Sequence, residues 1–516
     1  MRNFTILLCA GALLLGGCAT RYQKRGTEAP ITTAISLDDF EKKVSQSHQL
    51  DLEARSIERF SNPQFTVGVI ELTDEGFINR QQYEQVMYEV RETFKNAKEG
   101  AGSLLVVFAH GWHHGCRTCD RDLACFRRVL GELQEDEKAK DESKRRSVIG
   151  VYLGWRGVAL SGKLNTLTIW NRKRVAEHIG RTGGKEVLAA LHKEWLEHKE
   201  TNKPVTMVTV GHSLGGALIF SAVKDQLSGN VYDILKDSKK RGGTYRIVRA
   251  QGERGPAEQE DKKAIRSRFG DLVVLVNPAI EAGQYWPFDN DLPDDRFNDW
   301  GNEELIKSKL PLDKGDPYDK YQLPVLLTIA SDADTAVGRW FPIFRVFSVL
   351  NVLRNGEVFR DEAESVGMGR YRPQFTHRLH YQGTPPRDIK NDVKDNEISG
   401  ATCGCSKTWE GDLNNEMDKA YLPLEDTPMK PDSSESSASQ TPDAWRFQFD
   451  LVEERKCKGG GKCKGWDPHS PYFVVSTDKS VIREHSDIFN PVFTGFLRKF
   501  LAAFENKKPR DPGAVY

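Results

Sequence analysis

Short apolar runs alternate with segments of helical periodicity through much of this chain. The apolar runs are rich in β-branched residues and lack strict alternation, which is typical of strands buried on both faces of a parallel sheet. Alternation of such strands with helices predicts an α/β fold with a mostly parallel central sheet flanked by helices. The predicted strands are 65–72, 104–109, 148–153, 205–210, 272–276, 325–330 and 472–476, the predicted helices are 79–98, 185–199, 215–227 and 490–504, and residues 37–60 also show helical spacing.

Three segments interrupt this alternation, and they are predicted to be insertions in one domain that spans residues 37–510. Residues 229–269 are basic and contain several glycines, residues 283–323 are rich in Asp and Pro, and residues 345–470 form the longest insertion. Within the last, the Pro-, Ser- and Asp-rich stretch 425–443 is predicted to be disordered. For the basic insertion, a solvated loop is favoured over a surface that meets acidic lipid head groups.

The first apolar run of the chain belongs to a targeting segment rather than to the fold. Arg2 precedes the apolar residues 4–15, a stretch too short to cross a bilayer comfortably as a helix. The stretch ends in Leu15-Gly16-Gly17-Cys18, which resembles the lipobox of bacterial lipoproteins. That resemblance implies that residues 1–17 are a lipoprotein signal peptide, cleaved immediately before a cysteine that carries lipid. The alternative is an ordinary signal peptide in which the cysteine stands by chance.

The lipobox resemblance places the mature protein in the bacterial cell envelope. Lipid chains on Cys18 would anchor it to the membrane, and the polar residues 18–36 would form a tether. Ala19 rather than Asp follows the cysteine, which by the same resemblance favours the outer membrane. No other segment of the sequence reaches the length of a transmembrane helix, so the body of the protein is expected in an aqueous phase.

The charge balance argues against a nucleic-acid partner. The 516 residues include 74 Lys and Arg and 74 Asp and Glu, so the formal net charge is zero. Hydrophobic residues make up 38% of the chain and charged residues 29%, which suits a soluble globular body with many surface insertions.

The cysteines have two interpretations, disulfide bridges or zinc ligands. Nine cysteines are present, and an odd number remains when Cys9 in the signal peptide and Cys18 are set aside. At least one thiol is therefore unpaired even if the others form bridges. The pairs Cys116–Cys119 and Cys457–Cys463 could hold zinc, but their spacings fit no standard zinc template. An oxidising envelope also favours bridges.

The motif Gly211-His212-Ser213-Leu214-Gly215 lies between the predicted strand 205–210 and the predicted helix 215–227. A serine on a sharp strand-to-helix turn needs flanking residues without Cβ, and glycine provides them on both sides. The helix that follows directs its N-terminal N–H groups toward the place where an oxyanion would form. In this context the five residues indicate a nucleophile elbow rather than a Gly-rich turn with an incidental serine.

Together with this elbow, three further motifs resemble those of the α/β-hydrolase superfamily, and more narrowly those of bacterial lipase-like hydrolases. They are His110-Gly111-Trp112, Gly154-Trp155-Arg156-Gly157 and Val276-Asn277-Pro278-Ala279. The resemblance covers the strand-and-helix scaffold, residues 67–342 and 472–504, and leaves the insertions out. It implies an α/β-hydrolase fold with a Ser-Asp-His triad whose members follow one another in that order along the chain.

The resemblance assigns the triad to Ser213, Asp334 and His485. Asp334 follows a predicted strand and begins a D-x-x-V pattern, which favours it over Asp332 in the same loop. His485 lies between the last predicted strand and the last helix, in a segment similar to the histidine loop of the superfamily. The gap between acid and base is longer than is usual in the superfamily. Either residues 345–470 form a long excursion such as a lid, which we favour, or the acid lies elsewhere.

The same resemblance assigns two oxyanion donors. One is the backbone N–H of Leu214, directly after the nucleophile, and the other is that of Trp112, in the loop after an early strand. Each such donor stabilises the transition state by about 3 kcal/mol. A metal site built from His110, His113 and His114 is the competing interpretation of this loop. Adjacent histidines point in different directions, however, and no carboxylate completes the set.

The resemblance therefore implies a serine hydrolase that cleaves carboxylic esters, of the lipase or esterase kind, through an acyl-enzyme. Its partners would be an ester or lipid substrate and the membrane, and the mechanism needs neither a metal nor a cofactor. An envelope phospholipase or a thioesterase would apply the same chemistry to another acyl donor. A catalytically silent binding protein on the same fold is the alternative from another class, and a complete Ser, Asp and His order argues against it.

Overall fold

A computed structural model of the chain shows alternating strands and helices in two compact units. Unit 1 comprises Met1–Ala222 together with residues 391–406, and unit 2 comprises the remainder from Val223 onward. Each unit is described by itself below. The described residues are 25–26, 34–46, 55–157, 169–199, 201–241, 268–288, 324–337, 363–381, 447–451, 455–456, 462–463 and 471–506.

Several predicted segments lie outside the described residues. They are the signal peptide 1–17, Cys18, the stretch 425–443, and most of the insertions 229–269 and 283–323. In the part of the chain that the structure describes, no helix is long and apolar enough to cross a membrane.

Unit 1 contains strands that follow one another across a sheet in the order β1-β2-β4-β3-β5. The first two form an antiparallel hairpin, and the other neighbours run parallel. Every residue of the third strand in the sequence is buried, as its unbroken apolar run predicts for a strand covered on both faces. The strands are β1 (Ile57–Ser61), β2 (Gln64–Glu71), β3 (Ser103–Ala109), β4 (Ser147–Gly154) and β5 (Val205–His212).

The region 37–60, which shows helical spacing, is only partly helical. It begins with the helix α2 (Leu37–Gln46), but its end lies in β1. Phe60 stacks on Phe65 of the hairpin partner with ring centroids 4.6 Å apart, so cross-strand packing overrides the local spacing. The other helices of unit 1 are α3 (Arg80–Asn96), α4 (Arg121–Ala139), α5 (Ile169–Arg181), α6 (Gly183–Lys199) and the first turns of α7 (Leu214–Arg241).

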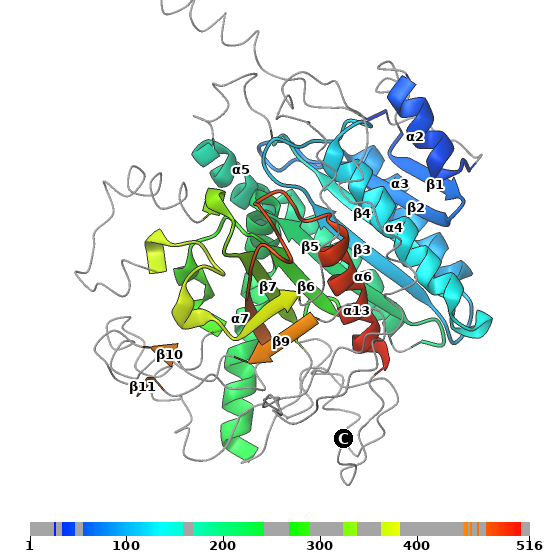
Figure 1. The fold of residues 1–516 in the computed structure, drawn as a ribbon. Helices are drawn as coiled ribbons and strands as arrows, with labels where there is room; N and C mark the ends of the chain where they lie inside the picture. Colours follow the sequence, from blue (N-terminus) through cyan, green and yellow to red (C-terminus); the bar gives the residue numbers. More distant parts are fainter. Residues whose placement is uncertain are drawn as a thin grey trace, which may run out of the picture. The chain divides into compact units, whose positions relative to one another are not determined.

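Helices cover both faces of the unit 1 sheet. Partners in a parallel register share a face, whereas successive residues of a strand alternate. Gly68 is partnered with Val151, so Gly68 and Gly150 face opposite sides. A Cβ on Gly68 would lie 2.6 Å from Val86 of α3, and one on Gly150 would lie 2.3 Å from Leu130 of α4. The two glycines therefore allow α3 and α4, blue and cyan in Figure 1, to pack closely on opposite faces of β2 and β4.

A buried charge cluster joins the N-terminal part of the chain to this sheet. Glu58 on β1 accepts two hydrogen bonds from Arg127 of α4, at 2.7 and 2.9 Å, and one from Arg25 at 2.5 Å. Burial acts to raise the pKa of Glu58, but the two guanidinium groups lower it to about 2. Arg25 falls in the predicted tether 18–36, yet it is 1% exposed and also donates to the carbonyl of Cys116. Arg25 is thus a packed residue of unit 1.

Unit 2 contains strands in the order β6-β7-β12-β8-β9, all parallel except the last. Two of them, together with a short pair of strands, come from residues 345–470. Part of that predicted excursion therefore widens the sheet. The strands are β6 (Leu272–Val276), β7 (Leu326–Ser331), β8 (His377–Tyr381), β9 (Phe447–Leu451), β10 (Arg455–Lys456), β11 (Lys462–Cys463) and β12 (Tyr472–Thr477), and the helix α13 (Pro491–Asn506) follows.

The fold is therefore the predicted α/β class, with mostly parallel strands flanked by helices. Parallel strands place their carboxyl ends at one edge of a sheet, and the loops at that edge carry the functional groups of open α/β folds. All the residues singled out from the sequence for catalysis follow the carboxyl ends of β3, β5, β7 and β12.

Candidate active site

Ser213 occupies the junction between β5, which ends at His212, and α7, which begins at Leu214. Its φ is +53°, in the left-handed region that non-glycine residues rarely adopt. The Ser213 carbonyl accepts the first helical hydrogen bond, from the N–H of Ala217 at 3.2 Å. A strained serine between a strand and a helix is the geometry of a nucleophile elbow, and such strain is concentrated at functional sites.

The two flanking glycines are required by the packing of this turn. A Cβ on Gly215 would lie 2.1 Å from the carbonyl oxygen of Ala109, at the end of β3. A Cβ on Gly211 would lie 2.7 Å from the carbonyl oxygen of Gly215 itself. Real Cβ atoms do not approach backbone atoms this closely, so the turn has room for glycine alone at both positions.

The loop after β3 lies directly against the elbow. Ala109 is the register partner of Gly211, so both chain segments leave the sheet at the same level. A Cβ on Gly111 would lie 3.0 Å from Nδ1 of His212 and 3.1 Å from Cβ of Ser213. The next backbone N–H along this loop is that of Trp112, the residue that the sequence assigns to the oxyanion hole.

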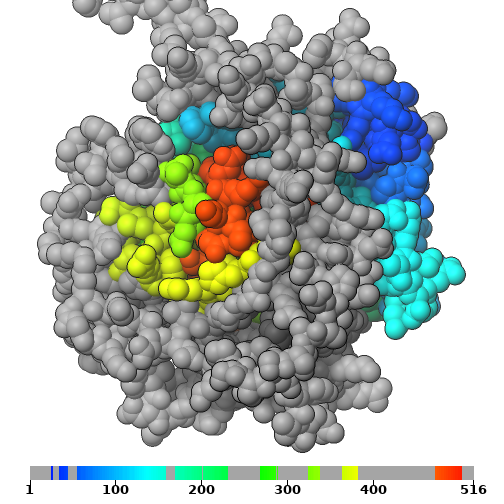
Figure 2. Space-filling view, viewed as in Figure 1, coloured from blue at the N-terminus to red at the C-terminus, as the bar shows by residue number. Residues whose placement is uncertain are grey.

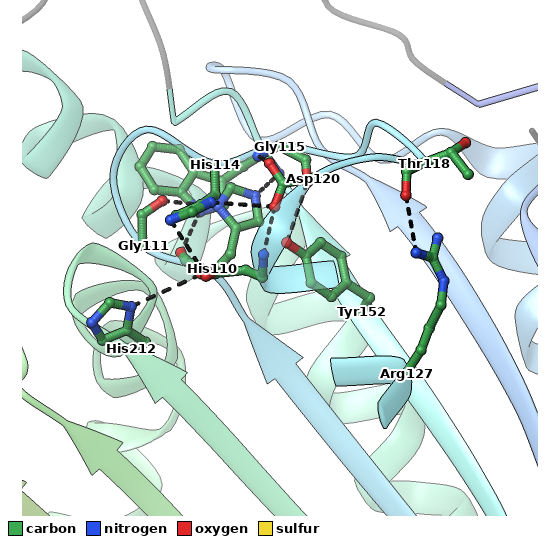
Figure 3. A network of polar contacts seen from close by, with 11 residues as sticks. His110, Gly111, His114, Gly115, Thr118, Asp120, Arg127, Tyr152 and His212 are labelled. Atoms are coloured by element: carbon green, nitrogen blue, oxygen red, sulfur yellow. Dashed lines mark hydrogen bonds and ion pairs between the residues drawn. The ribbon is translucent and has the colours of Figure 1, made fainter. Parts of the chain in front are cut away.

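His110 in this loop is a packing residue. Its ring lies between those of Trp155 and Tyr152, with centroids 5.5 and 5.4 Å away. Its Nε2 accepts the backbone N–H of Trp155 at 3.1 Å, so Nδ1 carries the proton and donates to the carbonyl of Gly111 at 2.9 Å. Burial lowers the pKa of His110 to about 4, which keeps the ring neutral. Figure 3 shows the rings of His110 and Tyr152 beside each other.

The described residues include no group of three or more His, Cys, Asp or Glu side chains arranged to hold a metal ion. The cysteines between this loop and the first turns of α4 follow the bridge interpretation rather than the zinc interpretation of the Cys116–Cys119 pair. Cys119 and Cys125 are disulfide-bonded, whereas Cys116 is a buried free thiol. Burial raises the pKa of Cys116 well above its usual value, so this thiol is not poised to react.

Asp334 and His485 form a pair within unit 2. Nδ1 of His485 lies 2.8 Å from Oδ2 of Asp334. The other oxygen of Asp334, a side chain that is 1% exposed, accepts the backbone N–H of Val337 at 3.0 Å. Asp332 is different, because its side chain is 66% exposed and its nearest cation, Arg370, is 3.9 Å away. Of the two acids that the sequence offers, Asp334 is therefore the one that contacts the histidine.

The contact with Asp334 sets the tautomer of His485. A carboxylate accepts a hydrogen bond from Nδ1–H, which keeps the proton on Nδ1 and leaves Nε2 as the basic nitrogen of the ring. The side chain of His485 is 22% exposed, so the ring is partly accessible while its acid partner is not. In Figure 2 the yellow-green segment 324–337, the yellow segment 363–381 and the orange segment after 471 adjoin on one face.

Asn277 connects the acid strand to the histidine loop, a role that the sequence did not reveal. It is fully buried, has φ +44°, and stands directly after β6. Its side-chain amide donates to the carbonyl of His485 at 3.0 Å, and its side-chain oxygen accepts the N–H of Ser331 at 2.9 Å. In the sequence, the only indication of Asn277 is the motif from Val276 to Ala279, which resembles a motif of α/β-hydrolases but does not indicate what the asparagine does.

The histidine loop is braced at its far end as well. Asp487 accepts the backbone N–H of Arg483 at 3.1 Å and also pairs with the Arg483 guanidinium at 2.9 Å. Asn490 donates to the carbonyl of Val481 at 2.9 Å and accepts the N–H of Phe493 at 3.0 Å, which caps α13. These local bonds fix the course of the loop on both sides of His485.

The predicted site residues thus form two sets. Ser213, Leu214 and Trp112 lie in unit 1, and Asp334 and His485 lie in unit 2. Cys18 lies outside the described residues.

Comparisons with known proteins add little to this geometry. No protein-family model and no curated protein matches the chain. A solved structure, the phospholipase PlaB from Legionella pneumophila in complex with thio-NAD, is similar at 15% identity with a TM-score of 0.19. The match covers 55% of this chain and 47% of that chain, so the chain spans about half the length of that protein.

Proposed function

We propose that this protein is a serine hydrolase of the α/β-hydrolase kind, which cleaves carboxylic esters through an acyl-enzyme. The observation that carries the proposal is the conformation of Ser213, at φ +53° between β5 and α7. Non-glycine residues rarely adopt this strained region, and such strain is concentrated at functional sites. The buried Asp334 paired with His485 supplies the acid and base that such a serine needs.

In the proposed reaction, Nε2 of His485 removes the proton of the Ser213 hydroxyl as its oxygen attacks the ester carbonyl. Asp334 accepts a hydrogen bond from the Nδ1–H group of His485 and stabilises the imidazolium that forms. The backbone N–H groups of Leu214 and Trp112 would stabilise the oxyanion of the tetrahedral intermediate. The imidazolium then protonates the leaving alcohol, and water, deprotonated by the same nitrogen, releases the acid and restores Ser213. This mechanism requires Nε2 of His485 within about 2.6–3.2 Å of the Ser213 oxygen.

A catalytically silent binding protein is disfavoured by the same contacts. Burying a carboxylate costs free energy unless it is paired. Asp334 is buried and its partner is His485, a histidine whose ring remains partly accessible. A binding scaffold needs no such pair. A phospholipase or a thioesterase would use the same groups on another acyl donor, and the ester-chain-length dependence of hydrolysis separates these substrates.

The decisive experiment is labelling with a fluorophosphonate probe. Wild-type protein is compared with Ser213→Ala, with His485→Ala, and with Ser228→Ala, an exposed serine of the same helix α7 that donates to the carbonyl of Asp225. The wild type and Ser228→Ala should be labelled at one site, which peptide mass spectrometry assigns to Ser213. Ser213→Ala should not be labelled, and His485→Ala should react about 10²–10⁴-fold more slowly. Labelling that persists in Ser213→Ala, or folded wild type that stays unlabelled, would exclude the proposed function.

We also propose that lipid on Cys18 tethers the protein in the bacterial cell envelope. The disulfide-bonded Cys119 and Cys125 support an oxidising compartment. Arg25 is already packed in unit 1, so only the six residues 19–24 separate the lipid-bearing Cys18 from it, and the reach is at most about 25 Å. Intact-mass analysis of the mature protein tests this proposal, because an unacylated Cys18 would contradict it.

A further inference from the structure

We call residues 110–115 the oxyanion loop. The imidazole of His114, in this loop, forms a buried bridge with two carboxylates at the start of α4. Nδ1 of His114 is 3.2 Å from Oδ1 of Asp120, and Nε2 of His114 is 3.3 Å from Oδ1 of Asp122. The second oxygen of Asp122 lies 4.0 Å from Nδ1 of His212, the residue before Ser213. The side chains of His114, Asp120 and Asp122 are 9, 11 and 5% exposed. Figure 3 shows the part of this bridge formed by His114 and Asp120.

The bridge holds the backbone of the oxyanion loop at several points. Asp120 accepts the N–H of Gly115 at 2.8 Å while it also caps α4 by accepting the N–H of Asp122 at 3.0 Å. The carboxylate of Asp122 faces the backbone N–H of Gly111. The carbonyl of His114 accepts the N–H of Gly157 at 3.1 Å. Gly111 near the start of the loop and Gly115 at its end are thereby both connected to the N-terminal end of α4.

The charges of the bridge depend on one another. Burial raises the pKa of Asp122 to about 6, an effect that Asp120 increases and His114 opposes. Burial also acts to raise the pKa of Asp120, but His114 and the N–H of Gly115 outweigh it and lower that pKa. His114 is thus the common partner of both carboxylates. Removing it would leave two buried acids close together without a cation or a donor between them, a costly arrangement.

The bridge ends where the oxyanion loop touches the elbow. Gly111 lies close to both His212 and Ser213, since a Cβ at this position would be 3.0 Å from Nδ1 of His212 and 3.1 Å from Cβ of Ser213. A small movement of this segment would change the position of the Trp112 N–H relative to the nucleophile. Because oxyanion donors act only at short distances, such a movement would weaken transition-state stabilisation without removing any reacting group.

We propose that His114, held between Asp120 and Asp122, is a positioning residue that fixes the oxyanion loop against the Ser213 elbow. This inference rests on the proposed function, since it assigns the loop its role in the same reaction. His110 does not share the role, because both of its nitrogens bond to backbone groups of Gly111 and Trp155. No member of the bridge touches the reacting atoms in the proposed mechanism.

The test compares His114→Gln and Asp122→Asn with matched controls outside the bridge. Asp122→Asn keeps the size of the side chain and removes its charge, and so is the milder change. Glu135→Gln, an exposed residue of the same helix α4, and His178→Gln, an exposed histidine of α5, are the controls. Thermal unfolding followed by circular dichroism establishes that each variant is folded, and Asp122→Asn alone decides if His114→Gln does not fold.

Two measurements give the answer. In ester hydrolysis, both bridge variants should lose about 10- to 100-fold in kcat with KM unchanged, less than the about 10²–10³-fold cost of removing a donor outright. In hydrogen exchange resolved to residues 110–115, the amides of the loop should exchange at least about 10-fold faster than in the wild type. The controls should stay within about two-fold in both, since exposed substitutions away from such features have small effects.

The exchange measurement needs no activity, so the inference and the proposed function can fail separately. Loop exchange and kcat that match the wild type in folded Asp122→Asn would overturn the role of the bridge while Ser213-dependent labelling stands. Faster exchange with an unchanged kcat would also overturn the positioning role, because the bridge would then hold the loop without any effect on the rate of the reaction. If wild type is not labelled at Ser213, the proposed function fails and the positioning role fails with it.

Discussion

His485 and Asp334 are separated by 151 positions in the chain, yet Nδ1 of the histidine lies 2.8 Å from the carboxylate. The reason is the order of the strands. β12, which precedes the histidine loop, is the parallel neighbour of β7, which precedes the acid loop, with Tyr472 opposite Leu326. Two loops that leave adjacent parallel strands at the same level meet whatever the length of chain between them. The long segment between them therefore does not disturb the pair.

Asp334→Asn should lower kcat about 10⁴-fold, as expected when an orienting carboxylate becomes an amide that favours the wrong histidine tautomer. KM should change little, because the carboxylate does not contact substrate. Steady-state hydrolysis of a short-chain ester measures both constants. Asp332→Asn is the matched control and should stay within about two-fold of wild type, since that side chain is 66% exposed. A large loss in Asp332→Asn with little effect at Asp334 would show that the acid has been misassigned.

The sequence was sufficient to predict the strands whose apolar runs are buried on both faces, such as β3 and β5. It was not sufficient for β1, where Phe60 packs on Phe65 across a hairpin and the local helical spacing is overridden. It also missed β8, whose sequence His377–Tyr381 carries three polar side chains and is a strand because it pairs with β12. Pairing of this kind depends on distant residues, so a local pattern does not contain it.

The same distinction applies to the site. The nucleophile turn could be predicted because it requires glycine at both flanking positions, which is a local steric requirement. In the structure, a Cβ at either glycine would clash with a backbone oxygen. The roles of Asn277 and His114 could not be predicted, because each acts through partners far away in sequence or on another element. Asn277 reaches His485 across 208 positions, and a lone asparagine after a strand gives no indication of such a partner.

Asn277→Asp should lower kcat about 10-fold or more, because the change removes the donor to the carbonyl of His485 while keeping the size of the side chain. An unpaired carboxylate at this fully buried position should also reduce the free energy of unfolding, by about 3–5 kcal/mol. Steady-state hydrolysis and urea unfolding measure the two effects. Asn96→Asp, at the exposed C-terminal end of α3, is the control; it should keep the wild-type kcat and lower the free energy of unfolding by less than about 1 kcal/mol. A folded Asn277→Asp protein with the wild-type kcat would show that Asn277 does not position the histidine.

The stability of the protein should fall in acid because of Glu58. Two buried guanidinium groups lower its pKa from the ordinary value of 4.5 to about 2 in the folded protein, so the folded state binds this proton less readily than the unfolded chain. The resulting stabilisation, about 3 kcal/mol, is fully present above about pH 4.5 and is lost as the pH falls toward 2.

Urea unfolding of wild type and Glu58→Gln at pH 6, 4 and 3 measures this contribution. Glu58→Gln should be the less stable protein at pH 6, and the difference should shrink as the pH falls. Glu142→Gln is the control, because Glu142 pairs with Lys98 on the exposed surface, where solvent screens the interaction. An equal loss of stability in wild type and Glu58→Gln between pH 6 and 3 would assign the acid sensitivity to other groups.

Gly215→Ala should abolish fluorophosphonate labelling. It should lower the free energy of unfolding only in part, so the protein stays folded. The new Cβ would lie 2.1 Å from the carbonyl oxygen of Ala109, a backbone atom of a central strand that has little freedom to move. The elbow would have to shift instead, and with it Ser213 and the first N–H groups of α7. Gly229→Ala, in the same helix with open space around its Cβ, is the control. It should keep full labelling and gain up to about 1 kcal/mol, since alanine favours helix interiors. Labelling of Gly215→Ala at the wild-type rate would show that the turn tolerates a side chain, and the steric account of the motif would be wrong.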